Sequence, residues 1–261
     1  MQGDSALGRA LGLVRDLRQR CPWDRAQTPQ TLRPYLVEEV HELDLAIKSD
    51  DPEAMRDELG DLLLHLAFQV VIGEERSQFN ADVVTRALEE KMWRRHPHLY
   101  AEGGEATASG RPSGHAGWEL VKRREPRAGG KRGTLAGLPP TLPPLLMAYR
   151  LQERAAGIGF DWPDASGPML KVKEETGELE REQGAGRREQ IEEELGDLLF
   201  AVINLSRKLA VEPNAALERA NAKFQDRFEK MEELAEERGV EMGRVGLEEL
   251  DKLWEEVKKK P

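Results

Sequence analysis

The stretch Asp57–Leu63, DELGDLL, decides the fold of this chain because it returns later as Glu193–Leu199, EELGDLL. Each copy follows a second acidic motif, which is Glu38–Glu42 (EEVHE) in the first half and Glu174–Glu178 (EETGE) in the second. All five acids of the second set lie 136 residues after their counterparts, as position 194 does after position 58. A repeat at one fixed offset indicates that the chain contains the same structural unit twice.

Apolar residues around these acids recur with the period of an α-helix. The stripe of the first acidic segment consists of Leu36, Val40, Leu43 and Ile47, and that of the second consists of Leu59, Leu62, Leu63, Leu66 and Val70. Such stripes predict two helices that each bury one face. Because no segment reads as a convincing strand, we expect an all-α fold made of two related helical bundles.

Caps and helix breakers mark where these helices begin and end. We expect Thr31 to cap the first helix, with Pro34 in the first turn, where proline is tolerated. Asp51 followed by Pro52 predicts the start of the second helix, and Gly73 predicts its end. The short turn between the two helices makes them antiparallel neighbours.

The second half repeats this plan. We expect helices at 168–182 and 187–209, joined by a turn through 184–186. A later helix also repeats, with Lys91–Arg95 in its first copy and Lys223–Arg227 in its second.

The two halves are joined by sequence of a different kind. Residues 101–143 are rich in Gly, Pro, Ala, Ser and Arg, and 118–122 has the composition of a short helix. We therefore expect an N-terminal helical domain at 1–100, a linker with a short helix at 101–143, and a C-terminal helical domain at 144–261.

The bulk composition excludes several classes of protein. The 261 residues carry a formal net charge of −10, which argues against a protein whose main task is binding nucleic acid. A small phosphate ligand remains compatible, because a bound metal can reverse the local field. The lone Cys21 cannot form an internal disulfide, so we expect a cytoplasmic protein. The apolar segments are too short to span a membrane, and the N-terminus around Asp4 and Arg9 lacks a signal-peptide core.

The acids of each copy are spaced so that they converge. Glu39 with Glu42, and Glu58 with Asp61, are three residues apart, which places each pair on one side of its helix. Two antiparallel helices can direct these carboxylates to one point, and only a cation relieves their repulsion. The second copy offers the equivalent acids Glu175, Glu178, Glu194 and Asp197. Ligands made only of oxygen predict a site for Mg²⁺, with Mn²⁺ as a substitute.

The acidic motifs are also compatible with three roles apart from a magnesium site. A single E-x-x-E motif is usually a solvated face, but its recurrence beside a leucine-rich stripe favours a metal site. A di-iron carboxylate bundle requires Glu-x-x-His, whereas His65 of the first copy is replaced by Ala201 in the second. A non-catalytic metal-binding scaffold or regulator is the remaining alternative.

Basic residues recur at matched positions and are candidate contacts for phosphate. Lys91 with Arg95, and Lys223 with Arg227, are each four residues apart, so each pair lies on one helix face. Ordinary surface charge is the alternative explanation for these residues, but their recurrence in both halves favours a role in function.

A nucleobase would need a flat apolar surface and a polar group at its edge. Trp254 is a candidate for stacking, as are Trp23 and Trp162, although each could instead belong to a core. Asn204 lies seven residues after Asp197, on nearly the same helix face. Its side chain could hydrogen-bond to the edge of a base or could instead contribute to packing.

The pattern E-E-x-x-E followed by E-x-x-D resembles the signature of the all-α nucleoside triphosphate pyrophosphohydrolases, and its tandem form is similar to the bacterial MazG family. The resemblance covers nearly the whole chain and includes the motifs Cys21–Asp24, Arg94–His98, Gly159–Trp162 and the helix of Lys223. It implies Mg²⁺-dependent hydrolysis of NTPs and dNTPs between the α and β phosphates. The products are a nucleoside monophosphate and pyrophosphate. The resemblance also implies that the protein forms homodimers.

The resemblance assigns roles to individual residues, mainly in the C-terminal copy, which is generally the catalytic one in such proteins. The metal ligands match Glu175, Glu178, Glu194 and Asp197. Glu174 matches a residue that holds a second metal or orients the attacking water. Lys223 and Arg227 match phosphate contacts, and Trp254 matches a base contact. The N-terminal copy keeps its acids, but His-Pro-His follows Arg95 where Phe228-Glu229-Lys230 follows Arg227, so the two pockets are expected to differ.

Overall fold

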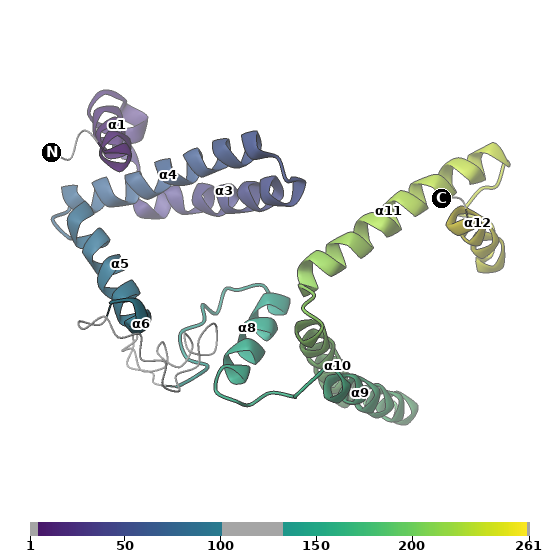
Figure 1. The fold of residues 1–261 in the computed structure, drawn as a ribbon. Coiled ribbons are helices and arrows are strands. Elements are labelled where there is room, and N and C mark those ends of the chain that lie inside the picture. The colour runs from purple at the N-terminus through teal and green to yellow at the C-terminus, as the bar shows by residue number, and fades with distance from the viewer. Residues whose placement is uncertain (1–4, 101–132, 260–261) are drawn as a thin grey trace. The chain divides into compact units, whose positions relative to one another are not determined.

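The computed structural model describes residues 5–100 and 133–259, and these ranges contain helices and no strand (Figure 1). The prediction of an all-α fold is therefore confirmed. The chain divides into two compact units, Met1–Thr107 and Ala108–Pro261. The expected helix at 118–122 and most of the expected linker lie outside the described residues, so the domain boundaries stay a prediction. No helix in the described ranges is long and apolar enough to cross a membrane.

Unit 1 is built around an antiparallel pair of helices. Its described helices are α1 (Ala6–Arg20), α2 (Pro22–Ala26), α3 (Pro29–Ser49), α4 (Pro52–Glu75), α5 (Ala81–Arg95) and α6 (Pro97–Tyr100). α3 and α4 lie side by side, and α1 packs against α4 (Figure 1). Asp51 caps α4 by accepting hydrogen bonds from the main-chain N–H groups of Glu53 (2.9 Å) and Ala54 (3.3 Å), as predicted.

Two predicted helix ends of unit 1 were wrong. α3 is capped by Thr28, whose hydroxyl accepts from the Thr31 N–H (3.2 Å), while the Thr31 hydroxyl accepts from the Thr28 N–H (2.8 Å). This reciprocal capping box favours the earlier start and leaves Pro34 inside the helix. α4 continues past Gly73, which is buried because the ring of Phe79 occupies the place where a Cβ would stand.

The core of unit 1 lies at one end of the α3–α4 pair. Its buried members are Leu11, Val14, Leu32, Ala67, Phe68, Val71, Ile72 and Ala81. Each large apolar side chain contributes about 1.5–3 kcal/mol when it is fully buried. The acids of α3 and α4 therefore lie on a helix pair that this core holds together at one end.

Arg18 joins three helices of unit 1. This buried guanidinium donates to the main-chain oxygens of Asp24 (2.7 Å) and Gln27 (3.2 Å) and forms an ion pair with Glu75 of α4 (2.7 Å). The hydrogen bond from Arg18 lowers the pKa of Glu75, which keeps this pair charged.

Unit 2 repeats the antiparallel pair. Its described helices are α8 (Pro144–Ala156), α9 (Ser166–Ala185), α10 (Arg188–Lys208), α11 (Pro213–Glu237) and α12 (Leu247–Lys259). α9 packs along α10, and α8 packs on α10 through a hydrogen bond from Gln152 to the main-chain oxygen of Phe200 (2.8 Å). The turn after α9 has Gly186 at φ 69°, and the turn after α3 has Asp50 at φ 54°. These equivalent positions share a left-handed backbone conformation, so the two copies repeat in backbone structure as well as in sequence.

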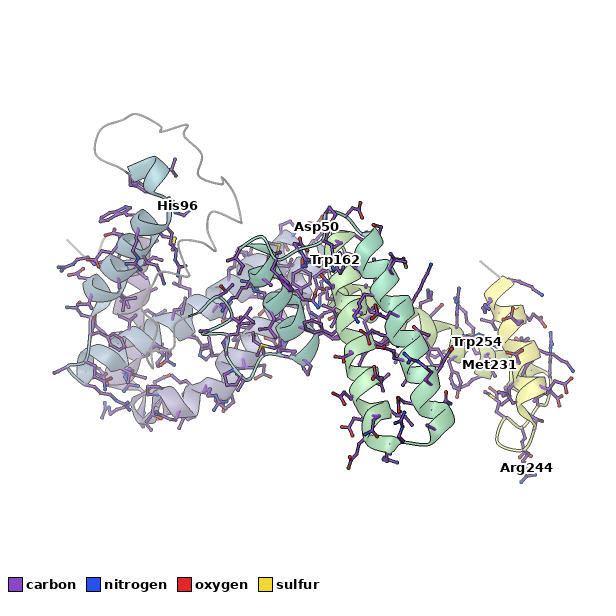
Figure 2. The ribbon with its side chains drawn as sticks, turned by 90° about the horizontal axis from the view of Figure 1, so that it is seen from below. Asp50, His96, Trp162, Met231, Arg244 and Trp254 are labelled. Carbon is purple, nitrogen blue, oxygen red and sulfur yellow. The ribbon has the colours of Figure 1, made fainter. Side chains whose placement is uncertain are left out.

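Two further contacts shape unit 2. Asp161 of the Gly159–Trp162 motif forms ion pairs with Arg207 and Lys208 at the end of α10, which fixes the segment before α9. At the other end, α11 and α12 enclose a small core of Met231, Leu234, Ala235, Leu253 and Val257, against which Trp254 packs (Figure 2).

Both helical pairs expose large apolar side chains. The α10 stripe, defined as Leu195, Leu199, Val202 and Leu209, is between 44% and 54% exposed. α4 carries a related row made of Leu59, Leu63 and Leu66. Contiguous apolar patches on a soluble chain mark surfaces that bind another molecule.

Candidate metal and nucleotide site

The acids of the first copy meet between α3 and α4. Glu39, Glu42 and Glu58 each place a carboxylate oxygen within 4.8 Å of the other two. Glu58 Oε2 is buried and has no hydrogen-bond partner among the described residues. Buried polar atoms nearly always have a partner, so this oxygen fits a ligand that still has to bind.

Crowding of like charges perturbs these carboxyl groups. Burial, followed by the charges of Asp61, Glu42 and Glu58, raises the pKa of Glu39. Burial, followed by Glu42 and Asp61, also raises the pKa of Glu58. Asp61 therefore belongs to the same cluster, and a bound dication would relieve the repulsion.

The first copy contains a histidine beside its acids. His65 is 8% exposed, and its Nε2 lies 3.7 Å from Glu39 Oε1. Burial lowers the pKa of His65, although Asp61 opposes the shift, so the imidazole is neutral at pH 7.

The acids of the second copy meet between α9 and α10. Glu175, Glu194 and Asp197 place oxygens within 4.8 Å of one another, and Glu175 is only 4% exposed. Burial, followed by the charges of Glu178, Glu175 and Asp197, raises the pKa of Glu194. Glu178 is thus close enough to act on the cluster, while it also forms an ion pair with Arg181 (3.0 Å).

Lys171 supplies a cation to the second cluster that the sequence analysis missed. Its Nζ lies 2.5 Å from Glu175 and 3.0 Å from Glu174. The hydrogen bonds to Glu175 and then Glu174 raise the pKa of Lys171. The signal was present in the sequence, since Lys171 precedes Glu175 by one helical turn. The equivalent position of the first copy holds Tyr35.

Comparison with known proteins identifies the family. The model of the MazG nucleotide pyrophosphohydrolase domain matches residues 27–100 and 167–233, so it covers both acid clusters. The chain belongs to the MazG nucleotide pyrophosphohydrolase family. The resemblance inferred from the sequence is thereby confirmed, and the chain is an enzyme of a hydrolase family.

Two relatives match nearly the whole chain. A nucleoside triphosphate pyrophosphohydrolase/pyrophosphatase MazG of Thermotoga maritima is 42% identical over 91% of this chain and 89% of its own length. A nucleoside triphosphate pyrophosphohydrolase of Escherichia coli is 38% identical over 94% of this chain and 93% of its own length. A protein of the same description from Mycolicibacterium smegmatis is 31% identical over 79% of this chain and 69% of its own length.

The residues that the MazG resemblance assigns to phosphate and base gather on α11 and α12. The ring of Trp254 lies 5.3 Å from that of Phe224, which is next to Lys223, and Phe224 stacks with Phe228 at 5.9 Å. Within the described residues, neither Lys223 nor Arg227 forms an ion pair with an acid of the second cluster. The ion pairs described within one chain therefore do not link these residues to the acids.

The other predicted binding residues are placed as follows. Asn204 Oδ1 accepts hydrogen bonds from Arg207 Nε (3.2 Å) and Nη2 (2.8 Å), so its acceptor oxygen is already engaged. Lys91 and Arg95 lie one turn apart on α5. Trp162 is half-exposed, with its ring against Gly167 at the start of α9, and Trp23 is exposed.

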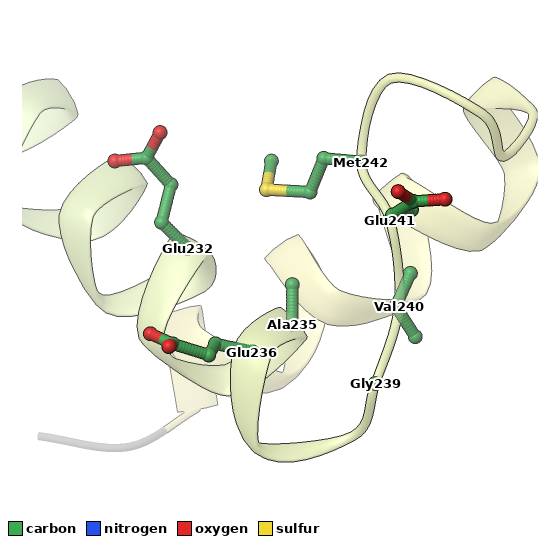
Figure 3. Close-up of a pocket in the computed structure, with 7 residues that line it drawn as sticks. All are labelled: Glu232, Ala235, Glu236, Gly239, Val240, Glu241 and Met242. Atoms are coloured by element: carbon green, nitrogen blue, oxygen red, sulfur yellow. The ribbon is translucent and has the colours of Figure 1, made fainter.

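A shallow pocket of about 410 Å³ lies at the end of α11, and its lining includes no residue of either acid cluster (Figure 3). Glu232, Glu236 and Glu241 form much of its lining, together with Met242. Carboxylates without a cation repel phosphate, so this pocket does not fit a nucleotide.

Proposed function

We propose that the chain hydrolyses NTPs and dNTPs between the α and β phosphates, which yields a nucleoside monophosphate and pyrophosphate. The convergence of Glu175, Glu194 and Asp197 in a cluster that raises the pKa of Glu194 carries this proposal. The names of the relatives from Thermotoga maritima and Escherichia coli support the reaction class. The single Cys21 supports a reducing, cytoplasmic setting.

We propose Mg²⁺ as the resident ion, with Mn²⁺ as a substitute. The donor set fits, because the acids offer only hard oxygens and Glu178 lies near enough to join them. In the first copy, Glu39, Glu42, Glu58 and Asp61 would hold the equivalent ion. A bound dication would neutralise the phosphate oxygens and make the attacking water easier to deprotonate.

The remaining roles fall to side chains around the cluster. Glu174, which is exposed beside Glu175 and pairs with Lys171, would orient the attacking water. Lys223 and Arg227 bind the leaving pyrophosphate and stabilise its charge. Trp254 stacks on the base, while Asn204 donates through its amide N–H groups. In the first copy, Lys91 and Arg95 take the phosphate role.

We propose a homodimer in which a second copy covers the α10 stripe. Four large apolar residues at helical spacing, each close to half exposed, are typical of a bundle that needs a partner. A symmetric dimer uses the same surface of both chains. Such packing also offers a route by which α11 of one chain reaches the acids of the other, since the described contacts of one chain do not join them.

The decisive experiment combines product analysis with a variant of the cluster. Wild-type protein with Mg²⁺ and a dNTP should release a nucleoside monophosphate and pyrophosphate, and EDTA should stop the reaction. Asp197→Ala should lose more than about 99% of turnover while the helical circular dichroism is retained, because Asp197 is exposed.

Asp251→Ala, which removes an exposed aspartate of α12, is the matched control and should keep full activity. Release of orthophosphate would contradict the cleavage position. Full activity of Asp197→Ala would move catalysis away from the C-terminal cluster. A protein that binds Mg²⁺ but turns over no nucleotide would support the alternative of a metal-binding scaffold or regulator.

A further inference from the structure

Asn204 of α10 presents one side of its amide to an arginine of the same helix. Its Oδ1 accepts hydrogen bonds from Arg207 Nε (3.2 Å) and Nη2 (2.8 Å). A guanidinium has five N–H donors and no acceptor, so the atom that faces it has to be the amide oxygen. The amide of Asn204 is therefore held in one orientation, with its NH₂ group turned away from Arg207.

Arg207 is itself held in place by a carboxylate. Asp161 accepts from Arg207 Nη1 at Oδ2 (3.1 Å) and from Nη2 at Oδ1, and Lys208 Nζ also donates to Oδ2 (3.2 Å). Although burial opposes the shift, the hydrogen bonds from Arg207 and Lys208 lower the pKa of Asp161, so this carboxylate is charged at neutral pH. The Arg207 side chain is only 12% exposed, so its acceptors and the surrounding packing fix it.

The NH₂ group of Asn204 is left to bind a ligand. Within the described part of unit 2, no group accepts a hydrogen bond from Asn204 Nδ2. Asp197 of the second acid cluster lies seven residues earlier on α10, which is roughly 10 Å along the helix axis. A nucleotide whose phosphates bind at Asp197 can therefore bring the edge of its base to Asn204.

The first copy shows that the helical plan does not require this polar network. The positions equivalent to Asn204 and Arg207 hold Phe68 and Val71, and both belong to the core of unit 1. Placing an amide and a guanidinium where they are largely desolvated costs free energy that apolar packing does not. The network in the second copy therefore calls for a role besides packing.

We propose that Asn204, held by Arg207, selects nucleotides whose base carries a keto oxygen over those that carry an amino group at the same position. An N–H donor pairs with O6 of guanine or hypoxanthine and with O4 of uracil or thymine, but it meets another donor at N6 of adenine or N4 of cytosine. Asn204 is thus a specificity-determining residue, while Arg207 and Asp161 are positioning residues. The inference rests on the proposed function, in which Asn204 contacts the base.

Steady-state kinetics with two matched pairs of substrates test the preference. ITP and ATP differ at position 6 of the purine, and UTP and CTP differ at position 4 of the pyrimidine. The full chain carries Glu58→Ala, which disables the acid cluster of the first copy. With Mg²⁺, kcat/KM for pyrophosphate release should be about tenfold higher for the keto member of each pair. The difference should lie mainly in KM, because the contact to the base is the same in the ground state and the transition state.

Substitutions in this parent separate selection by Asn204 from a structural role. Asn204→Asp keeps an acceptor for Arg207 but presents only oxygens to the base, so the preference should reverse towards ATP and CTP. Arg207→Met keeps the stem of the side chain and lets the amide rotate, so the ratio should fall below about twofold. A structural role alone would slow both members of each pair equally and would leave the ratio unchanged.

Other variants provide the control and a safeguard. Arg244→Met removes an exposed arginine that pairs with Glu241 (2.7 Å), and it should keep the tenfold ratio. If Arg207→Met does not fold, Asp161→Asn weakens the hold on Arg207 with little change of shape and should also lower the ratio.

The outcomes separate the inference from the proposed function. Equal kcat/KM values within each pair for the parent, or a keto preference that survives Asn204→Asp, overturn the inference but leave the proposed reaction standing. A chain that hydrolyses none of the four nucleotides overturns the proposed function, and the inference with it.

Discussion

Replacing Lys171 by methionine should destabilise the metal-free C-terminal copy. The Lys171 ammonium lies 2.5 Å from a carboxylate oxygen of Glu175, and the Glu175 side chain is only 5% exposed. Lys171→Met keeps the length of the side chain but leaves a buried negative charge without a counter-charge. Because the pKa of Lys171 is raised, the contribution is present at every pH below about 10 and is lost only above it.

The size of the effect follows from the exposure of the two partners. Breaking a fully buried ion pair costs about 3–5 kcal/mol, while exposed pairs contribute about 1 kcal/mol or less. Since the Lys171 side chain is 43% exposed and that of Glu175 is buried, we expect about 1.5 kcal/mol. That value corresponds to roughly a tenfold change in an opening equilibrium.

Hydrogen exchange followed by mass spectrometry measures this change locally in α9 and α10. In EDTA, protection in these helices should fall roughly tenfold in Lys171→Met. Saturating Mg²⁺ should remove the difference, and Mg²⁺ should bind the variant about tenfold more tightly because no ammonium has to be displaced. Lys173→Met, at an exposed position of α9, is the matched control. Equal loss of protection with and without Mg²⁺ would refute the reasoning.

Three further perturbations test other parts of the structure. Because the pKa of Glu194 is raised, its contribution to stability is present below about pH 4 and is lost as pH rises through the folded-state value. Glu194→Gln in EDTA should therefore melt above wild type at pH 7, and the gap should close near pH 4. Leu199→Arg should convert the proposed dimer to a monomer in light scattering, whereas Leu247→Arg, at an exposed site of α12, should not. Arg18→Ala should cost about 2–3 kcal/mol in urea unfolding of unit 1, and an unchanged midpoint would contradict its joining role.

The helices and the acid clusters could be predicted from the sequence because both depend on local spacing. Stripes at positions such as Leu59 and Leu66 have the helical period, and Asp51 followed by Pro52 is a local cap. The convergence of Glu39 and Glu58 then follows from the short turn between α3 and α4.

Features that depend on tertiary contacts could not be predicted in this way. Gly73 looks like a helix end in the sequence, but it is required by the ring of Phe79, which packs against it. The start of α3 was misplaced because Thr28 and Thr31 are both acceptable caps, and the reciprocal bonds between them decide which one is used. The ion pair of Lys171 with Glu175 was missed because only burial of the acid distinguishes it from ordinary surface charge.

The α11 residues show a different limit. The spacing of Lys223 and Arg227 predicts a shared helix face, and α11 provides it. The spacing of these residues does not predict which other helices this face of α11 contacts. Within the described part of unit 2, the ring of Phe224 in this region packs against those of Phe228 and Trp254.

The lysine at position 171 also bears on how the chain is made. Glu175 is buried in the folded chain, so its negative charge has to be neutralised as α9 and α10 pack together. In the C-terminal copy the neutralising charge is encoded one turn earlier on the same helix, so this half can reach its shape during translation without waiting for metal. The N-terminal copy has Tyr35 at that place, so this position brings no positive charge to Glu39 as its helix forms.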